Sequence, residues 1–164
     1  MNFIYGNFTQ NDLKSILEYD PSTGKFLRYM VKGMKPTGFV HNGYITIKIG
    51  TTGFKAHSLA FLYMTGKWPK EEVDHINGNT IDNRWINLRE ATHSQNSKNR
   101  KLNIDSTSGF KGVKKDGNRW RADIGFNNKI VYLGAFDSPE NAHAAYVSAA
   151  SFYYGEFIRS HEHE

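Results

Sequence analysis

The stretch VDHINGNTIDNRWINLREATHSQNSKNR, residues 73–100, decides the fold expected for this chain. It opens on Asp74-His75, and a polar Ile-Asn-Gly-Asn turn follows at once. A second short apolar run carries Asn87, and polar residues at helix-compatible spacing include Asn96. The pattern predicts two short strands and a helix. Three such elements can bring a carboxylate, an imidazole and two amides to one point.

These residue types suit metal-assisted hydrolysis. Mg²⁺ prefers oxygen ligands and keeps several waters, so one or two protein side chains commonly hold it. Asp74 and Asn96 could fill that role. His75 titrates near neutrality, as a base that activates water must. We therefore expect a divalent metal cofactor, Mg²⁺ with Mn²⁺ as the alternative, and no organic cofactor.

Each residue also has a plainer interpretation. Asn-Gly is a strong turn signal, so Asp74-His75 could simply precede the polar turn of a hairpin. Asn96 could be a solvated helix residue. His93 would share the helical face of Asn96, as a spare ligand, a phosphate contact or a half-exposed histidine. The joint pattern, more than any single residue, favours a nuclease site.

The joint pattern resembles the HNH nuclease motif, in the DH…N…N variant typical of phage and intron-encoded homing endonucleases. The resemblance implies a ββα-metal fold in which Asp74 and Asn96 are metal ligands and His75 is the general base. It also implies that Asn87 steadies the loop and the base. Many relatives have His at the last position; an amide there lowers the expected metal affinity and suits zinc less.

Length, composition and charge set further bounds. The chain has 164 residues, room for one or two small domains. The absence of cysteine excludes disulfides and Cys-type zinc ribbons and suits a reducing cytoplasm. No segment approaches the roughly 18 apolar residues of a membrane span, so no membrane partner is expected. The formal net charge of +5 favours a polyanionic partner.

Positive charge gathers between Ser97 and Arg121. Against two acids in that stretch, the bases are Lys98, Arg100, Lys101, Lys111, Lys114, Lys115, Arg119 and Arg121. A solvated charged face would explain such a run, but the interleaved Phe110 and Trp120 favour nucleic acid. Arg89, like Lys98, is a candidate clamp for a DNA phosphate.

The N-terminal part is expected to form an α/β extension of the nuclease module. Apolar periodicity and turn signals predict a helix over 11–19, strands over 25–30 and 44–49 with a partner beginning near Phe54, a loop over 32–36, and a buried helix over 57–64. His57, in the last of these, is expected to be a packing residue rather than a catalytic one.

The C-terminal part changes composition after an aperiodic linker. Three strands over 110–115, 119–126 and 130–135, and a helix capped by Ser138, are expected there. Alternation turns Trp120 towards the helix and Arg119 and Arg121 towards solvent. Phe152 is expected in the core.

Residues 111–150 closely resemble an AP2 domain, a DNA-binding module that is also appended to phage HNH nucleases. By matching positions, the contacts with DNA would be Lys111, Lys114, Asp123 and Tyr132, the last in place of a Trp. Gly125 and Ile130 stand where plant members have contacting arginines, so the DNA site read must differ. Because the side chains of Arg119 and Arg121 are expected to point to the solvent face of the strand, we infer that they replace these missing arginines as DNA contacts.

The fold class expected is α+β: a ββα-metal nuclease module with an N-terminal α/β extension, then a three-stranded antiparallel sheet plus helix. The expected boundaries are 1–101 for the nuclease domain, 102–108 for the linker, 109–158 for the AP2-like domain and 159–164 for a tail.

The function expected is a sequence-tolerant, site-directed DNA endonuclease of the homing type. Its products would carry 5′-phosphate and 3′-hydroxyl ends, and one site per chain would nick one strand at a time. The expected partner is double-stranded DNA, bound by a monomer of phage origin in the host cytoplasm. A non-catalytic DNA-binding regulator and a structure-dependent nuclease acting on junctions or RNA stay open as alternatives.

Overall fold

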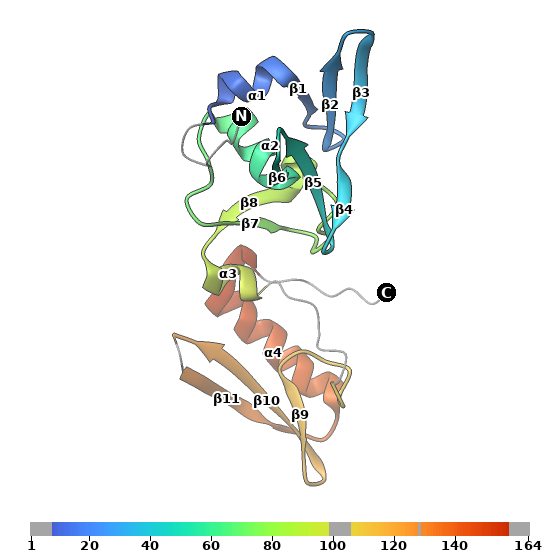
Figure 1. Cartoon of the computed structure of the whole chain (residues 1–164). Helices are drawn as coiled ribbons and strands as arrows, with labels where there is room; N and C mark the ends of the chain where they lie inside the picture. Colours follow the sequence, from blue (N-terminus) through green and yellow to red (C-terminus); the bar gives the residue numbers. More distant parts are fainter. Residues whose placement is uncertain (1–7, 99–105, 128, 158–164) are drawn as a thin grey trace. The chain divides into compact units, whose positions relative to one another are not determined.

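The computed structural model describes residues 8–98, 106–127 and 129–157 (Figure 1). The chain divides into two compact units of mixed helix and strand, Met1–Asn96 and Ser97–Glu164. The part of the expected linker up to residue 105, and the expected tail, lie outside the described residues. No helix within the described ranges is both long enough and apolar enough to cross a membrane.

The first helix, α1 (Gln10–Ile16), begins with a reciprocal cap. The Thr9 hydroxyl accepts from the Asp12 N–H at 3.2 Å, and the Asp12 carboxylate accepts from the Thr9 N–H at 2.8 Å. Both N–H groups would otherwise lack a partner at the helix start. The helix is shorter than the predicted 11–19, because the chain becomes extended and enters strand β1 (Leu17–Asp20).

The first sheet has the order β1-β2-β3 and is antiparallel. Strand β2 (Lys25–Met30) has the predicted bounds. The loop prediction over 32–36 is wrong, since strand β3 (Gly33–Thr37) occupies that segment. β3 is exposed along nearly its whole length, so its sequence shows no apolar alternation, and backbone hydrogen bonds to β2 hold it instead.

The turn between β1 and β2 packs closely against a distant loop. Gly24 has a φ of 71°, and a Cβ there would lie 2.4 Å from the Asn83 carbonyl carbon. The Trp85 N–H donates to the Pro21 carbonyl at 2.9 Å, and the Tyr19 hydroxyl donates to the Asn83 carbonyl at 2.7 Å. Glycine alone fits both this approach and this backbone conformation.

The second sheet places β5 (Tyr44–Ile49) between β4 (Phe39–His41) and β6 (Thr52–Lys55). Helix α2 (Ala56–Thr65) follows β6 directly and ends at Gly66, whose φ is 75°. β5 and α2 form where the sequence predicts them. The largest buried side chains of this unit are Phe8, Leu13, Leu17, Ile47, Phe54, Leu59 and Leu62.

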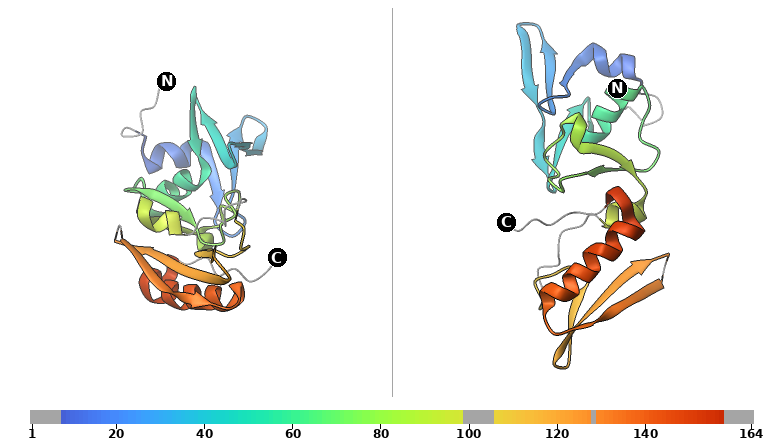
Figure 2. Two further views of the ribbon diagram at one scale, coloured as in Figure 1. Left: turned by 90° about the horizontal axis from the view of Figure 1, so that it is seen from below. Right: turned by 180° about the vertical axis from the view of Figure 1, so that it is seen from behind.

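A third, two-stranded sheet completes the first unit (Figures 1 and 2). Strand β7 (Glu72–His75) pairs antiparallel with β8 (Leu88–Ala91), and helix α3 (His93–Lys98) follows. A short 3-10 helix, η1 (Trp85–Asn87), leads into β8. The order strand, strand, helix is the predicted one.

The second unit holds strand β10 (Arg119–Phe126) between β9 (Val113–Asp116) and β11 (Lys129–Phe136), all antiparallel. Helix α4 (Pro139–Tyr154) lies along one face of this sheet (Figures 1 and 2), and a 3-10 turn, η2 (Gly155–Phe157), ends it. Three strands followed by a helix match the prediction from sequence.

Small residues let α4 approach the sheet. Ala142, Tyr146 and Ala150 form one buried stripe, and Ala122 of β10 is fully buried beneath it. The expectation that Phe152 lies in the core is wrong, because its side chain is 83% exposed. Phe152 stands two positions after Ala150, about 200° round the helix from the stripe.

Candidate active site and nucleic-acid interface

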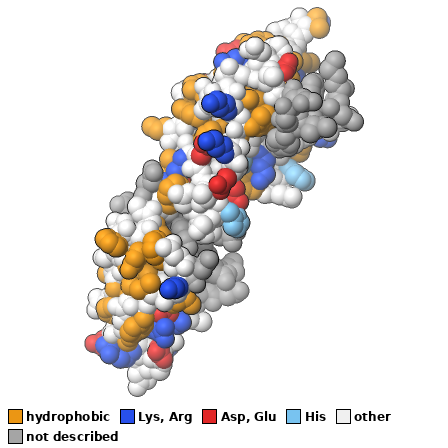
Figure 3. Space-filling view, turned by 90° about the vertical axis from the view of Figure 1, so that its left-hand side faces the viewer, with side chains coloured by type: hydrophobic (Ala, Val, Ile, Leu, Met, Phe, Trp, Pro, Cys, Tyr) orange, Lys and Arg blue, Asp and Glu red, His pale blue; other side chains and the backbone are white. Residues whose placement is uncertain are grey.

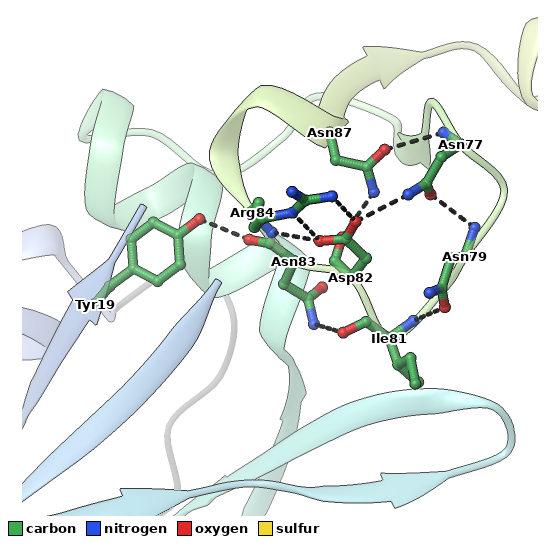
Figure 4. Close-up of polar contacts among 8 residues, drawn as sticks. All are labelled: Tyr19, Asn77, Asn79, Ile81, Asp82, Asn83, Arg84 and Asn87. Carbon is green, nitrogen blue, oxygen red and sulfur yellow. Dashed lines mark hydrogen bonds and ion pairs between the residues drawn. The ribbon is translucent and has the colours of Figure 1, made fainter. Parts of the chain in front are cut away.

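The loop between β7 and β8 is held by its own side chains (Figure 4). The Asn87 side-chain oxygen accepts from the Asn77 N–H at 2.9 Å, and its amide nitrogen donates to the Asp82 carbonyl at 2.8 Å. Asn87 is only 6% exposed. The side chain therefore ties both limbs of the loop to the start of β8.

Asp82 is the charged centre of this loop, and the sequence analysis did not single it out. Its carboxylate accepts from Arg84 at 2.6 and 2.8 Å and from the Asn77 amide at 2.8 Å. The Arg84 hydrogen bonds lower the pKa of Asp82 to about 2, and Asn77 adds to that effect. The carboxylate is thus ionised throughout the ordinary pH range.

His75 ends β7 and is 3% exposed. Its Nε2 lies 3.2 Å from the Oδ1 of buried Asn83. Because a carbonyl oxygen can only accept, Nε2 carries the proton, and in the neutral ring the lone pair lies on Nδ1. Burial lowers the pKa of His75, although Asn83 and Asp74 act in the opposite direction. The imidazole is therefore neutral near pH 7, as a proton acceptor must be.

A second imidazole contacts the first. The His57 and His75 ring centroids lie 5.0 Å apart at 78°, and the Tyr44 ring lies 5.5 Å from His57 and 6.2 Å from His75. Burial, followed by the charges of His75 and Lys55, lowers the pKa of His57 to about 3. His57 is a buried packing residue as expected, but its contact with His75 could not be read from the sequence.

Asp74 faces Arg89 across the β7–β8 pair. The Arg89 Nε and Nη2 donate to Asp74 Oδ2 at 2.8 and 2.7 Å. The two side chains are 12% and 3% exposed, respectively. Arg89, expected as a phosphate clamp, thus offsets the charge of the expected metal carboxylate in this structure.

Asn96 and His93 both reach Glu72 from α3. The Asn96 amide nitrogen donates to Glu72 Oε2, and His93 Nδ1 lies 2.7 Å from Glu72 Oε1. The Asn96 and His93 hydrogen bonds lower the pKa of Glu72. The sequence analysis missed Glu72; its position two residues before Asp74, on the same face of a strand, was the available signal.

The expected metal donors are consistent with Mg²⁺ in their chemistry. Asp74 offers a carboxylate, and Asn96 offers Oδ1, since its nitrogen is held by Glu72; oxygen donors are those that Mg²⁺ prefers. The described contacts place Asp74 and Asn96 in separate pairs rather than joining them. Within the described residues, no group of three or more His, Cys, Asp or Glu gathers as a metal cluster.

The open face of the second unit's sheet carries a connected set of charges. Lys114 Nζ lies 2.8 Å from Asp123 Oδ2, and Arg121 Nε donates to Asp123 Oδ1 at 2.8 Å. The Arg121 guanidinium lies 4.9 Å from the Tyr132 ring centroid. Tyr132 is 56% exposed. Burial would raise the pKa of Asp123, but hydrogen bonds from Lys114 and Arg121 outweigh it and lower the pKa.

A β-bulge in β10 helps to bring these charged and aromatic side chains together. The register of β10 against β11 shifts between Ala122 and Asp123, so that Asp123 stands opposite Tyr132. A bulge of this kind re-aims side chains at the edge of a binding surface. Arg119, at the start of β10, pairs with Asp137 at 3.2 Å.

The other expected DNA contacts are placed in part. The Lys111 carbonyl accepts from His143 Nδ1 at 3.4 Å, and Lys98 is the last residue of α3. Arg100 and Lys101 lie outside the described residues. On the face drawn in Figure 3, lysine and arginine side chains stand singly or in small groups among apolar and uncharged ones.

One charge signal in the sequence was overlooked. Residues 21–70 contain eight lysines and arginines and no aspartate or glutamate. This stretch forms β2 to β6 and α2, so these elements of the first unit carry positive side chains and no carboxylates. Such an excess favours a polyanionic partner for this unit as well.

Residues 54–98 match the family model described as HNH endonuclease. The matched segment runs from β6 to α3. It therefore contains Asp74, His75, Asn87 and Asn96.

A solved structure on DNA binding and cleavage by the HNH homing endonuclease I-HmuI is also similar. The identity is 22%, the TM-score is 0.43, and the match covers 77% of this chain and 75% of that chain. A TM-score below 0.5 does not establish a shared architecture. A search of curated proteins found no match.

Proposed function

We propose that this chain is a metal-dependent DNA endonuclease of the HNH type. The observation that carries the proposal is His75, a buried neutral imidazole at the end of β7, inside the segment that matches the HNH family. His75 directly follows Asp74 at the end of β7, and a histidine base next to a metal-binding carboxylate suits metal-assisted phosphodiester hydrolysis.

In this mechanism His75 takes a proton from the attacking water. Asn83 holds the Nε2 proton, so the lone pair on Nδ1 is the accepting site. The water oxygen bonds to phosphorus, the bond to the 3′ oxygen breaks, and the 3′ oxygen takes a proton from solvent. The products carry 5′-phosphate and 3′-hydroxyl ends. Asn87 keeps the β7–β8 loop in shape and so positions the base.

Asp74 and Asn96 are the residues proposed to hold a divalent ion, Mg²⁺ with Mn²⁺ as the alternative. When bound, the ion supplies positive charge to the phosphate and the leaving 3′ oxygen. Arg89 orients the Asp74 carboxylate, and Glu72 orients the Asn96 amide, as outer partners of metal ligands commonly do.

The second unit is proposed to hold and select double-stranded DNA. Its exposed sheet face presents Lys114, Arg121 and Tyr132, and a sheet of this width can lie in the major groove. The AP2-like assignment rests on the sequence resemblance. The homing type, phage origin and action in the host cytoplasm belong to the same proposal and have the same support.

A supercoiled-plasmid assay tests the chemistry. The wild type should produce nicked circles with Mg²⁺ and none with EDTA. His75→Ala should lower the rate by about 10²–10⁴, the usual loss for a general base, and should keep its affinity for DNA. His41→Ala, at an exposed histidine of β4, is the control and should cut normally.

The products separate this proposal from its rivals. One site per chain hydrolyses one bond at a time, so a monomer should produce nicked circles before linear DNA. DNA binding without cleavage in any divalent metal would favour a non-catalytic regulator. Preferential cutting of branched DNA or RNA would favour a structure-dependent nuclease.

A further inference from the structure

Phosphodiester hydrolysis concentrates negative charge on the phosphate, and cations placed to meet that charge stabilise the transition state. Two arginines near the site are already paired in this structure. Arg84 lies 2.6 Å from Asp82, and Arg89 lies 2.7 Å from Asp74. A third cation, Lys55, is differently placed.

Lys55 is the last residue of β6 and stands directly before α2. Its Nζ lies 4.4 Å from the centroid of the Tyr44 ring. The Tyr44 ring in turn contacts His57 at 5.5 Å and His75 at 6.2 Å. The Tyr44 ring therefore lies close both to the Lys55 ammonium and to the imidazole of the expected base.

The charge of Lys55 also reaches His57. It lowers the pKa of that buried imidazole, after the larger effects of burial and of His75.

Lys55 is also available to a ligand. Its side chain is exposed. Among the residues that the structure describes, no carboxylate lies within ion-pair distance of it. A tyrosine face holds an exposed ammonium only weakly, and a compact ammonium with three donors suits phosphate oxygens. A phosphate can therefore take the ammonium from Tyr44 without breaking an ion pair.

We propose that Lys55 binds the DNA phosphate that is cleaved, and that Tyr44 holds the ammonium in place before DNA arrives. The inference rests on the proposed function and adds a substrate-binding residue to it. Lys55 then supplies the charge that Arg84 and Arg89, bound to their carboxylates, do not.

The test compares full-length Lys55→Met and Lys55→Arg with a matched control. In Lys14→Met the lost ammonium lies 4.9 Å from the ring of a different tyrosine, Tyr63. Single-turnover cleavage should fall by about 10²–10³-fold in Lys55→Met, the scale of losing one charge-stabilising donor. Lys55→Arg should keep most of the rate, and Lys14→Met should match the wild type.

A second arm measures binding in EDTA, so that no divalent ion contacts the phosphate, to a duplex whose cleaved linkage is a neutral methylphosphonate. The wild type should bind it more weakly than natural DNA, and Lys55→Met should bind both alike. If the methylphosphonate penalty persists in Lys55→Met, or if Lys55→Met cuts as fast as Lys14→Met, the inference is wrong while the proposed function stands. Absence of cleavage by the wild type would overturn both.

Discussion

The β7–β8 loop and the open face of the β9–β11 sheet are both polar surfaces, yet they are built in opposite ways. In the loop, buried amides such as Asn83 and Asn87 bond to backbone groups. On the sheet, the exposed Lys114 and the half-buried Arg121 both bond to the carboxylate of Asp123. The loop has one arrangement of its groups, whereas the sheet face can rearrange when a ligand arrives.

The energies of these contacts differ accordingly. A buried polar group that loses its partner costs about 1–3 kcal/mol. An exposed ion pair contributes about 0–1 kcal/mol, because water and salt screen it. We infer that the loop sets the geometry of the chemistry and that the sheet face adapts to the DNA. Four predictions test this difference.

The largest expected effect follows from Asn87→Ala in the loop. The change leaves the Asn77 N–H and the Asp82 carbonyl without partners, so the free energy of unfolding should fall by about 2–4 kcal/mol. Urea unfolding measures it. Asn79→Ala, at an exposed position of the same loop, should cost no more than about 0.5 kcal/mol. Equal losses in the two variants would show that burial does not distinguish them.

On the sheet face, Arg121→Ala should leave stability within about 0.5 kcal/mol of the wild type. It should narrow the free-energy gap between preferred and random DNA by about 1–3 kcal/mol if the guanidinium reads a base edge. Competition binding measures the gap. Because Arg121 stacks on Tyr132, the double variant with Tyr132→Ala should lose less than the two single losses together. Equal weakening on all DNA would contradict base reading.

Asp82 gives the loop a distinctive acid sensitivity. Its pKa is about 2 in the folded chain against a reference of 3.8, so folding favours the ionised form. The resulting stabilisation is complete above about pH 4 and is lost as the pH falls towards 2. Hydrogen exchange of residues 76–87 should accelerate over that window in the wild type. In Asp82→Asn it should be fast at all pH values, and a pH-dependent rise there would contradict the assignment.

The smallest effect is expected from Lys114→Ala. A lysine that contacts phosphate should flatten the log–log dependence of DNA affinity on salt by about one unit. Since Asp123 already offsets part of the Lys114 charge, the observed change should not exceed that value. Affinity for preferred and random DNA should fall together. An unchanged slope would remove Lys114 from the phosphate contacts.

Regular periodicity allowed much of the fold to be predicted. β5 and β10 form over the predicted residues because their alternating side chains bury one face. α4 begins after Ser138 because a serine there caps the first turn. β3 was not predicted, because it buries almost no side chain and only its pairing with β2 identifies it as a strand.

The site was predictable as a motif but not as a set of contacts. Spacing led to Asp74, His75 and Asn96, whose roles stay predictions. Glu72 bonds Asn96 across a strand and a helix, and His57 meets His75 from another element. Contacts between distant segments leave no periodic trace in a single sequence, so these partners became visible only in three dimensions.

The close packing at Gly24 bears on whether residues 54–98 could be moved between proteins as a unit. The family match covers residues 54–98, as if this segment could fold and act in another protein by itself. Yet the β7–β8 loop within this segment packs against the turn at Gly24. Tyr19 and Pro21, from the same β1–β2 hairpin, form hydrogen bonds with this loop. A gene fusion that transplanted residues 54–98 alone would remove the β1–β2 hairpin against which the loop packs. The smallest piece worth exchanging, by recombination or by design, therefore starts well before the recognisable motif.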